Sequence, residues 1–260
     1  MTRRLIQCAL VTLTLTATSF ASTITNVTIK GLFNSPTDDT PGVQVGDPAV
    51  TPAGAAAVTR VSWGVPPGVG NPQSSYVFSA INQPSLPNIG GPIPVNPPAV
   101  TPYFVLGSFT HNNFVVDNPY LTSVKLDVIL SFDVDGVNTG PHTFTFLFNH
   151  TETPNVIEKA IPVCPFLTTV GEECTDRVVL NGTAPQNIVI GGVTFTLDLS
   201  LQVGGSPVSQ FITREGFANT ADVVARFSSA STPGIPEPAT VAMLGSALLL
   251  IGARRWRSKQ

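Results

Sequence analysis

The consecutive polar residues Thr110, His111, Asn112 and Asn113 are the group in this sequence best suited to chemistry. One imidazole and two amides offer several hydrogen-bond donors and acceptors, and a neutral imidazole can also bind a metal ion. The four residues either form a recognition corner for glycan hydroxyls or a metal, or they form a turn at a strand end, where Asn side chains cap local backbone groups. We favour the turn, because Asn commonly takes this role.

The three histidines of the chain give only a weak indication of a metal site. His142 and His150 are eight residues apart, on the same face of a predicted strand. Because a strand rises about 3.3 Å per residue, these two side chains lie about 26 Å apart and cannot share one ion. His111 together with one of them stays open as a ligand pair. We therefore expect no metal and no cofactor.

Residues 133–138, Asp-Val-Asp-Gly-Val-Asn, resemble a calcium loop only in part. When they are aligned with an EF-hand loop, its first and last ligand positions fall on Ser131 and His142. An acidic residue is thus missing at both ends of the loop. The Asp-Gly dipeptide favours a β-hairpin turn instead, and calcium bound elsewhere stays open.

Enzyme signatures are absent from the sequence. It contains no Gly-x-Ser-x-Gly elbow, no His-Glu-x-x-His and no phosphate-binding glycine loop. The paired acids Glu172 and Glu173 are best explained by a solvated turn. We therefore expect a protein that is not an enzyme. An extracellular hydrolase is a less favoured alternative, because the two acids of a glycosidase need not be close in sequence.

The N-terminal residues 1–21 have the pattern of a secretory signal peptide. Arg3 and Arg4 precede an apolar run over residues 5–17, and Ser19 and Ala21 place small residues at the −3 and −1 positions of a cleavage site. The chain is therefore expected to be exported through the secretion translocon.

Export affects the three cysteines, because Cys8 is removed with the signal peptide. Cys164 and Cys174 remain, with nine residues between them, including a proline and a glycine. In an oxidising compartment such a pair is expected to close a loop as a disulfide. The alternative is that the two cysteines bind a metal ion, but the sequence shows no further ligands nearby.

The C-terminal residues 234–260 combine three ordered elements. Pro236, Glu237 and Pro238 come first, an apolar segment over residues 239–253 follows, and Arg254 and Arg255 begin a basic cluster. The prolines cannot lie inside a helix, so a helix begins at about residue 239. An apolar helix of about 20 residues spans a bilayer, and the flanking uncharged residues and Arg254 extend this shorter segment. The arginines favour the cytoplasmic side.

This tail resembles the PEP-CTERM sorting signal of Gram-negative bacteria. The resemblance implies recognition by an exosortase, an integral-membrane cysteine protease or transpeptidase, near Pro236–Pro238. It implies transit through the inner membrane and delivery to the cell surface or extracellular matrix. An ordinary C-terminal membrane anchor is the alternative.

The region between the two signals predicts an all-β domain over residues 22–230. Apolar residues occupy every second position over residues 124–132, 143–149 and 193–201, and most of the residues between them are polar. This period of two gives each strand one buried and one wet face. Several such strands imply two antiparallel sheets packed face to face, a jelly-roll or immunoglobulin-like β-sandwich. Further strands are expected over residues 23–33, 57–63, 76–81, 211–213 and 222–227.

The same region resembles the THxN family of PEP-CTERM proteins and the related choice-of-anchor K domain. The residues that carry the resemblance include Thr110–Asn113, Trp63 and the cysteine pair, and it spans roughly residues 24–227. It implies an exported β domain and names no catalytic residue.

The net charge of the region between the two signals agrees with an exported domain. The region between the signals carries seven basic and fifteen acidic residues, a net charge of −8, which disfavours nucleic-acid binding. We expect a structural or adhesive protein whose partners are the exosortase and the translocon, with exopolysaccharide as a further candidate. A carbohydrate- or calcium-binding extracellular module is the alternative.

Overall fold

Strands and turns, with no helix, make up the part of the chain that the computed structural model describes: residues 21–22, 24–39, 58–81, 93–94, 100, 102–134, 136–181, 186–190 and 193–228. Nearly all of the predicted signal peptide 1–21 lies outside these residues. So does the whole sorting signal 234–260, with Pro236, Glu237, Pro238, the predicted helix 239–253, Arg254 and Arg255. No helix that could cross a membrane occurs in the described ranges.

The described strands, in chain order, are β1 (Ala21–Ser22), β2 (Ile24–Asp38), β3 (Val58–Trp63), β4 (Ser74–Ala80), β5 (Ile93–Pro94), β6 (Phe104–Asn113), β7 (Leu121–Val134), β8 (Val137–Thr151), β9 (Asp176–Asn181), β10 (Gln186–Ile190), β11 (Val193–Val203), β12 (Ser206–Val208), β13 (Gln210–Thr213) and β14 (Phe217–Ser228). The predicted strands all coincide with one of these, and several are longer than their patterns indicated.

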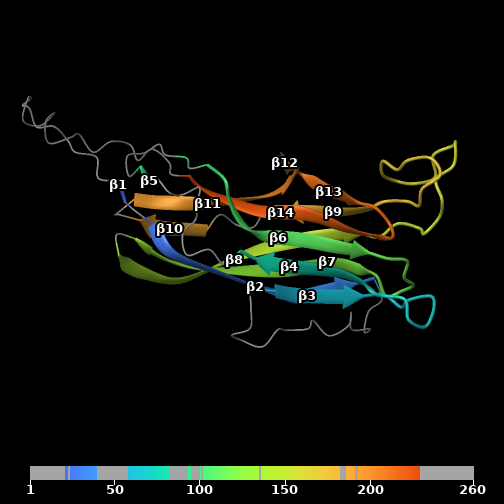
Figure 1. Ribbon diagram of the computed structural model, residues 1–260, viewed down its shortest axis with the longest axis horizontal. Coiled ribbons are helices and arrows are strands. Elements are labelled where there is room, and N and C mark those ends of the chain that lie inside the picture. The colour runs from blue at the N-terminus through green and yellow to red at the C-terminus, as the bar shows by residue number, and fades with distance from the viewer. Residues whose placement is uncertain are drawn as a thin grey trace, which may run out of the picture. The chain divides into compact units, whose positions relative to one another are not determined.

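Two antiparallel sheets lie one over the other (Figure 1). The large sheet has the order β10-β11-β14-β6-β4-β3, with β12 paired to β11, and the small sheet has the order β13-β9-β8-β7-β2. The short strands β1 and β5 pair with each other. The predicted antiparallel β-sandwich is thereby confirmed.

The core fills the space between the two sheets. In β8 the side chains of Phe144, Phe146 and Phe148 are buried while their neighbours are less so, as a period of two requires. Phe148 stacks on Phe109 of the large sheet, with ring centroids 4.6 Å apart. The centre of the sandwich is therefore apolar and aromatic.

Strand β6 is the main element that the sequence analysis missed. Its burial alternates except at Leu106 and Gly107, which are both buried. Its buried positions include Gly107, His111 and Asn113 as well as apolar residues. A glycine and two polar residues on the core side hide the apolar period on which strand prediction depends. The strand expected over residues 23–33 is longer than predicted, because β2 continues to Asp38.

The predicted hairpin turn within residues 133–138 is confirmed, since β7 and β8 pair up to Val134 and Val137. Gly136 has a φ of +79°, which favours glycine. The side chain of Asp133 accepts hydrogen bonds from Asn26 and Asn138, at 2.6 and 2.8 Å.

Cys164 and Cys174 form a disulfide, as the sequence predicts. It lies in the long connection between β8 and β9. The carboxylate of Glu158 accepts hydrogen bonds from the backbone N–H groups of Val163 and Cys164, at 3.1 and 2.9 Å. Glu158 is also within ligand distance of both sulfur atoms, but the disulfide leaves no thiolate for a metal.

Loss of this disulfide is expected to lower the free energy of unfolding by about 2–3 kcal/mol, because the crosslink restricts the unfolded chain. Urea unfolding of the Cys164→Ser/Cys174→Ser variant would measure the effect. Treating the wild type with a reductant should reproduce it, and an equal stability of variant and wild type would contradict the prediction.

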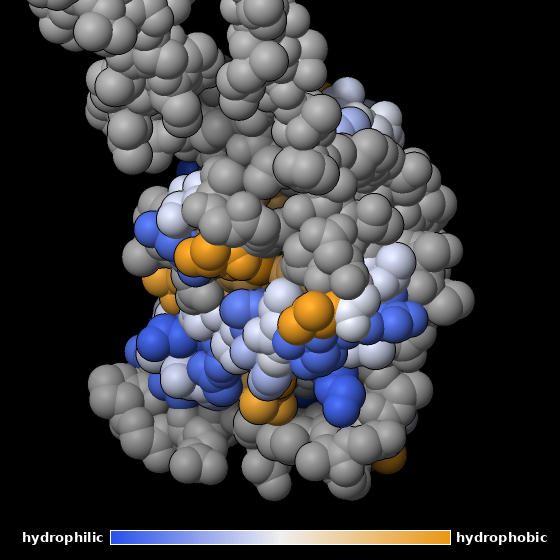
Figure 2. Space-filling view, turned by 90° about the vertical axis from the view of Figure 1, so that its left-hand side faces the viewer, coloured by the Kyte–Doolittle hydropathy of each residue, from blue (hydrophilic) through white to orange (hydrophobic). Residues whose placement is uncertain are grey.

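The surface carries scattered apolar side chains. On the face drawn in Figure 2, small hydrophobic patches lie among hydrophilic residues. Single exposed apolar residues are normal for folded proteins, so this pattern by itself identifies no docking surface.

Candidate functional site

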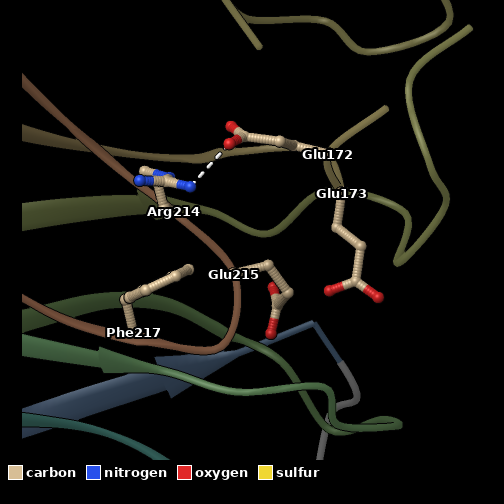
Figure 3. A pocket seen from close by; sticks show the side chains of 5 residues that line it. All are labelled: Glu172, Glu173, Arg214, Glu215 and Phe217. Atoms are coloured by element: carbon tan, nitrogen blue, oxygen red, sulfur yellow. Dashed lines mark hydrogen bonds and ion pairs between the residues drawn. The ribbon is translucent and has the colours of Figure 1, made fainter. Parts of the chain in front are cut away.

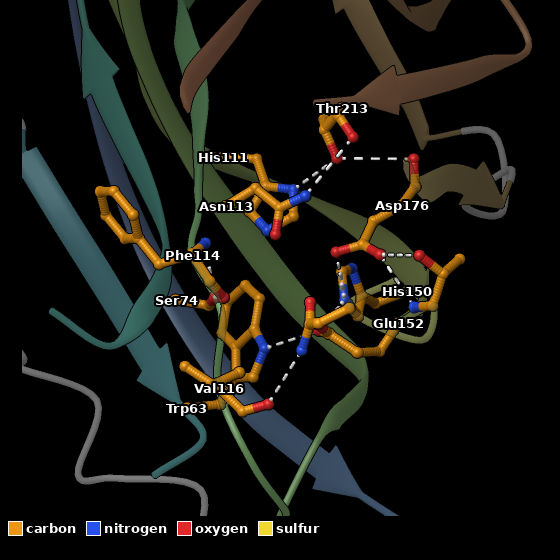
Figure 4. A network of polar contacts seen from close by, with 12 residues as sticks. Trp63, Ser74, His111, Asn113, Phe114, Val116, His150, Glu152, Asp176 and Thr213 are labelled. Carbon is orange, nitrogen blue, oxygen red and sulfur yellow. Dashed lines mark hydrogen bonds and ion pairs between the residues drawn. The ribbon is translucent and has the colours of Figure 1, made fainter. Parts of the chain in front are cut away.

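Polar side chains from both sheets meet inside one end of the sandwich, where β3 and β6 end and where the long β8–β9 connection begins (right side of Figure 1). Figure 4 shows several of them converging, among them His111, His150 and Asp176. The large sheet contributes Trp63, Tyr76, His111 and Asn113, and the small sheet with its adjoining loops contributes His150, Glu152, Thr153, Asp176, Thr213 and Glu215. We call these ten residues the buried polar cluster. The members of the cluster that lie on strands are at most 6% exposed.

His111 is buried in the middle of the cluster, and it lies there because it continues the inward face of β6 after Phe109. Its Nδ1 is 2.9 Å from the hydroxyl of Thr213, whereas its Nε2 has no hydrogen-bond partner among the described residues. Burial lowers the pKa of His111 well below its usual value, and the neighbouring His150 lowers it further. The imidazole is therefore neutral and can act as a ligand.

His150 continues the inward face of β8 after Phe148. Its Nδ1 is 2.6 Å from the hydroxyl of Tyr76, its Nε2 is 3.0 Å from Oε2 of Glu152, and the same Nε2 is 4.0 Å from Oδ2 of Asp176. The rings of His111 and His150 are 5.2 Å apart and perpendicular. The sandwich thus brings together two histidines from opposite sheets.

Three carboxyl groups complete the cluster. Oδ1 of Asp176 accepts hydrogen bonds from the N–H and the hydroxyl of Thr153, at 2.8 and 3.0 Å, but its Oδ2 has no hydrogen-bond partner among the described residues. Oε1 of Glu152 and both carboxylate oxygens of Glu215 also lack hydrogen-bond partners there. None of the three forms an ion pair with a lysine or arginine of the described residues.

This arrangement changes the acidity of two of the carboxyls. Burial raises the pKa of Asp176 to about 7, and the charge of Glu152 adds to the rise while His150 and Thr153 oppose it. Burial also raises the pKa of Glu215 to about 8, together with the charges of Asp176, Glu152 and Glu173. A cation in the cluster would relieve the repulsion that both shifts reflect.

In metal-free buffer the stability of the protein is expected to fall as the pH rises. Glu215 has a pKa of about 8 when folded and 4.5 as a free side chain, so only the folded state keeps its proton between these values. Its contribution is fully present below about pH 4.5 and is lost as the pH rises through 8. Asp176 acts in the same direction, because its pKa is 3.8 as a free side chain and about 7 when folded.

Urea unfolding at pH 5, 6.5 and 8.5 would measure this fall, and Glu215→Gln should make it smaller. Asp117→Asn, which changes an exposed carboxyl outside the cluster, serves as the control. A stability that rises over this pH range in the wild type would contradict the prediction.

A surface pocket of about 190 Å³ opens next to the cluster. It is lined by Glu172, Glu173, Arg214, Glu215 and Phe217 (Figure 3). Arg214 pairs with Glu172 at 2.6 Å and lies over the ring of Phe217 at 4.5 Å. Glu215 belongs both to this pocket and to the buried polar cluster, so it connects the interior with the surface.

Two sets of residues in the cluster have the spacing of metal ligands. His111, His150 and Asp176 offer ligand atoms that all lie within 4.8 Å of one another, and so do Glu152, Asp176 and Glu215. The first set combines two imidazoles with one carboxylate, a donor set found at zinc and other transition-metal sites.

The four residues Thr110–Asn113, expected to form a turn with a recognition corner as the alternative, do not act as one group. They are the last four residues of β6 rather than a turn. His111 and Asn113 face inward, where the amide of Asn113 lies 3.4 Å from the carbonyl oxygen of Thr213. Thr110 and Asn112 face the other side of the sheet, where they contact Thr220 and Ser75 at 3.1 Å.

The histidine pair that the sequence left open is His111 with His150. His142 lies elsewhere, 3.3 Å from the hydroxyl of Thr139 and stacked on Phe132. Asp176, Glu152 and Glu215 belong to the buried polar cluster although their places in the sequence did not predict a site there. One signal was present: His150 follows Phe144, Phe146 and Phe148 at the same spacing, which predicts a buried histidine.

No family model matches the sequence, and a search of curated proteins found no matching protein.

Proposed function

We propose that the chain is an exported β-sandwich protein that serves a structural or adhesive role at the cell surface or in the extracellular matrix. The observation that carries this proposal is the ordered tail: Pro236–Pro238, the apolar residues 239–253, and the basic pair Arg254 and Arg255. Such a tail has the features of a sorting signal. A signal of this kind directs a protein to the cell surface or the extracellular matrix, where its ectodomain acts.

The fold supports the proposal in two ways. The disulfide between Cys164 and Cys174 is of a kind that persists in oxidising compartments and is rare in the cytosol. The antiparallel sandwich, of jelly-roll or immunoglobulin-like type, is an architecture common among cell-surface domains. Both features agree with a signal peptide over residues 1–21 and an ectodomain over residues 22–230.

Sorting proceeds in three steps in this proposal. The translocon exports the chain, the helix 239–253 holds it in the inner membrane with Arg254 and Arg255 on the cytoplasmic side, and an exosortase cuts near Pro236–Pro238. The two prolines keep Glu237 in an extended segment, which a processing enzyme can reach.

Fractionation of cells that contain the sorting enzyme tests this function. An epitope tag within residues 85–99 reports the protein, and the variant Pro236→Ala/Glu237→Ala/Pro238→Ala is compared with a Ser231→Ala/Thr232→Ala control. We expect the wild type and the control in the surface or medium fraction and the triple variant in the inner membrane. A wild type held in the inner membrane, or a triple variant that is sorted normally, would contradict the proposal.

The pocket favours carbohydrate binding as a second candidate function. Phe217 is 51% exposed at the rim. The guanidinium of Arg214 lies over its ring at 4.5 Å, and Glu172 and Glu173 line the same pocket. An exposed ring can stack on a sugar face while charged groups bind hydroxyls. Loss of glycan-array binding in Phe217→Ala would support this function, and an absence of any binding by the wild type would exclude it.

A further inference from the structure

We propose that His111, His150 and Asp176 form a binding site for one divalent transition-metal ion, with Zn²⁺ as the ion that fits best, inside the buried polar cluster. The proposal goes beyond the sorting function and does not depend on it.

The spacing of the three side chains fits a metal centre. Around a tetrahedral zinc ion with bonds of about 2.0–2.1 Å, the ligand atoms lie about 3.3 Å apart. The ligand atoms of His111, His150 and Asp176 lie within 4.8 Å of one another, and Nε2 of His150 is 4.0 Å from Oδ2 of Asp176. Side-chain shifts of about 1 Å therefore close the site, without a change in the strands.

Two of the proposed ligand atoms form no hydrogen bond in the described part of the chain. Nε2 of His111 and Oδ2 of Asp176 are buried and form no hydrogen bond with the described residues, and both residues are 0% exposed. An unpaired buried polar atom costs about 1–3 kcal/mol, so native proteins rarely contain one without a reason. An ion bound between these two atoms satisfies both of them.

The remaining polar atom of each ligand is held by a hydrogen bond. Thr213 fixes Nδ1 of His111, Tyr76 fixes Nδ1 of His150, and Thr153 fixes Oδ1 of Asp176, at distances from 2.6 to 3.0 Å. Metal-binding histidines and carboxylates are oriented in this way by surrounding residues. The cluster therefore has the outer contacts of a metal centre as well as its ligands.

Glu152 is placed to become the fourth ligand. Its Oε2 lies 3.0 Å from Nε2 of His150 and 3.4 Å from the indole nitrogen of Trp63, while its Oε1 has no partner among the described residues. When the ion takes the lone pair of His150, the carboxylate of Glu152 can turn Oε1 toward the ion and keep the contact with Trp63.

The charge balance of the cluster also favours a cation. Asp176, Glu152 and Glu215 lie within ligand distance of one another, and no lysine or arginine of the described residues pairs with them. The pocket supplies a route, because its acidic residues Glu172 and Glu173 lead to Glu215 at the edge of the cluster. A divalent ion would be attracted along this route and would neutralise the carboxylates.

The donor atoms select the kind of metal. Imidazole nitrogen suits zinc and other transition metals, whereas calcium and magnesium prefer oxygen ligands alone. The cysteines of the mature chain are joined in a disulfide, so no thiolate takes part. We therefore expect binding of Zn²⁺, and of Co²⁺ as its spectroscopic substitute, but not of Ca²⁺.

Metal analysis of the full-length chain, purified in detergent without a histidine tag, tests the proposal. The protein is stripped with a chelator, reloaded with Zn²⁺ and dialysed, and its zinc content and thermal unfolding are then measured. Asp176→Asn is the informative variant, because the amide oxygen can still accept the hydrogen bonds from Thr153. His142→Gln is the matched control, since it removes a histidine outside the cluster.

We expect one zinc ion per chain in the wild type and in His142→Gln, and a melting temperature that rises with Zn²⁺ but not with Ca²⁺. We expect Asp176→Asn to bind zinc at least about 100-fold more weakly, beyond the 10–100-fold loss typical of outer contacts. A wild type without bound zinc after reloading, or an Asp176→Asn variant that binds as tightly as the wild type, would overturn the proposal. So would loss of zinc from His142→Gln.

The Co²⁺ spectrum of the wild type tests for the tetrahedral metal site even if Asp176→Asn fails to fold. Tetrahedral Co²⁺ bound by imidazole and carboxylate absorbs strongly in the visible range, whereas octahedral Co²⁺ on surface carboxylates absorbs weakly. A strong visible band that Zn²⁺ displaces at one equivalent supports the site. A weak band, like that of Co²⁺ in buffer, overturns it.

Discussion

Phe148→Ala is expected to lower the free energy of unfolding by about 3–5 kcal/mol. The side chain of Phe148 is 0% exposed and stacks face to face on Phe109, with centroids 4.6 Å apart and an angle of 8° between the rings. The rings of Phe146 and Tyr76 lie 6.3 and 6.4 Å away. Truncation removes this contact between the two sheets and leaves a cavity that rigid strands cannot close.

Urea unfolding of the wild type and the variant measures the effect of Phe148→Ala. Phe217→Ala is the matched control, because it makes the same chemical change at a ring that is 51% exposed. The control should cost about 1 kcal/mol or less. Equal losses for the two variants would show that the rings of Phe109 and Phe148 are not packed as described.

Gly107→Ala is expected to cost about 3 kcal/mol, at the upper end for overpacking. A Cβ atom at this position would lie 2.5 Å from the backbone oxygen of Ser79 and 2.6 Å from the ring of Phe78. Strand β6 pairs with β4 at this point, and its pairing with β14 shifts register beside it. Neither the backbone nor the buried ring can move without disturbing the large sheet.

Thermal and urea unfolding of Gly107→Ala would test this contact. Gly68→Ala is a fitting control, because Gly68 is exposed and its added Cβ atom would meet only the end of the Asn71 side chain, at 3.2 Å. The control should change stability by no more than about 0.5 kcal/mol. A Gly107→Ala variant as stable as the control would contradict the close approach of β6 and β4.

The sandwich could be predicted from the sequence because its longest strands alternate cleanly. Phe144, Phe146 and Phe148 are apolar, and their neighbours are mostly polar, so the period of two is visible without any knowledge of partners. The disulfide could also be predicted, because the expected removal of Cys8 with a signal peptide leaves Cys164 and Cys174 as one possible pair. The sandwich follows from the local alternation of apolar and polar residues, and the disulfide follows from an oxidising compartment.

The buried polar cluster could not be predicted in the same way. His111, His150 and Asp176 lie on β6, β8 and β9, and their distances depend on how two sheets pack and on the register of each strand. A polar residue on the inward face also resembles a strand end when only the sequence is read, which is why Thr110–Asn113 suggested a turn. The spacing of His150 after Phe148 predicts that this histidine is buried, but the meeting of the three side chains arises from tertiary packing, for which the sequence has no local signal.

The mass of the intact protein recovered from the cell surface or the medium tests export and processing of the tail together. We predict a chain that begins at Ser22, ends near Pro238 and contains the Cys164–Cys174 disulfide. Such a product shows export, oxidation and processing of the tail in a single measurement. A chain that keeps Arg254 and Arg255 at its end and carries free thiols at Cys164 and Cys174 would contradict the account.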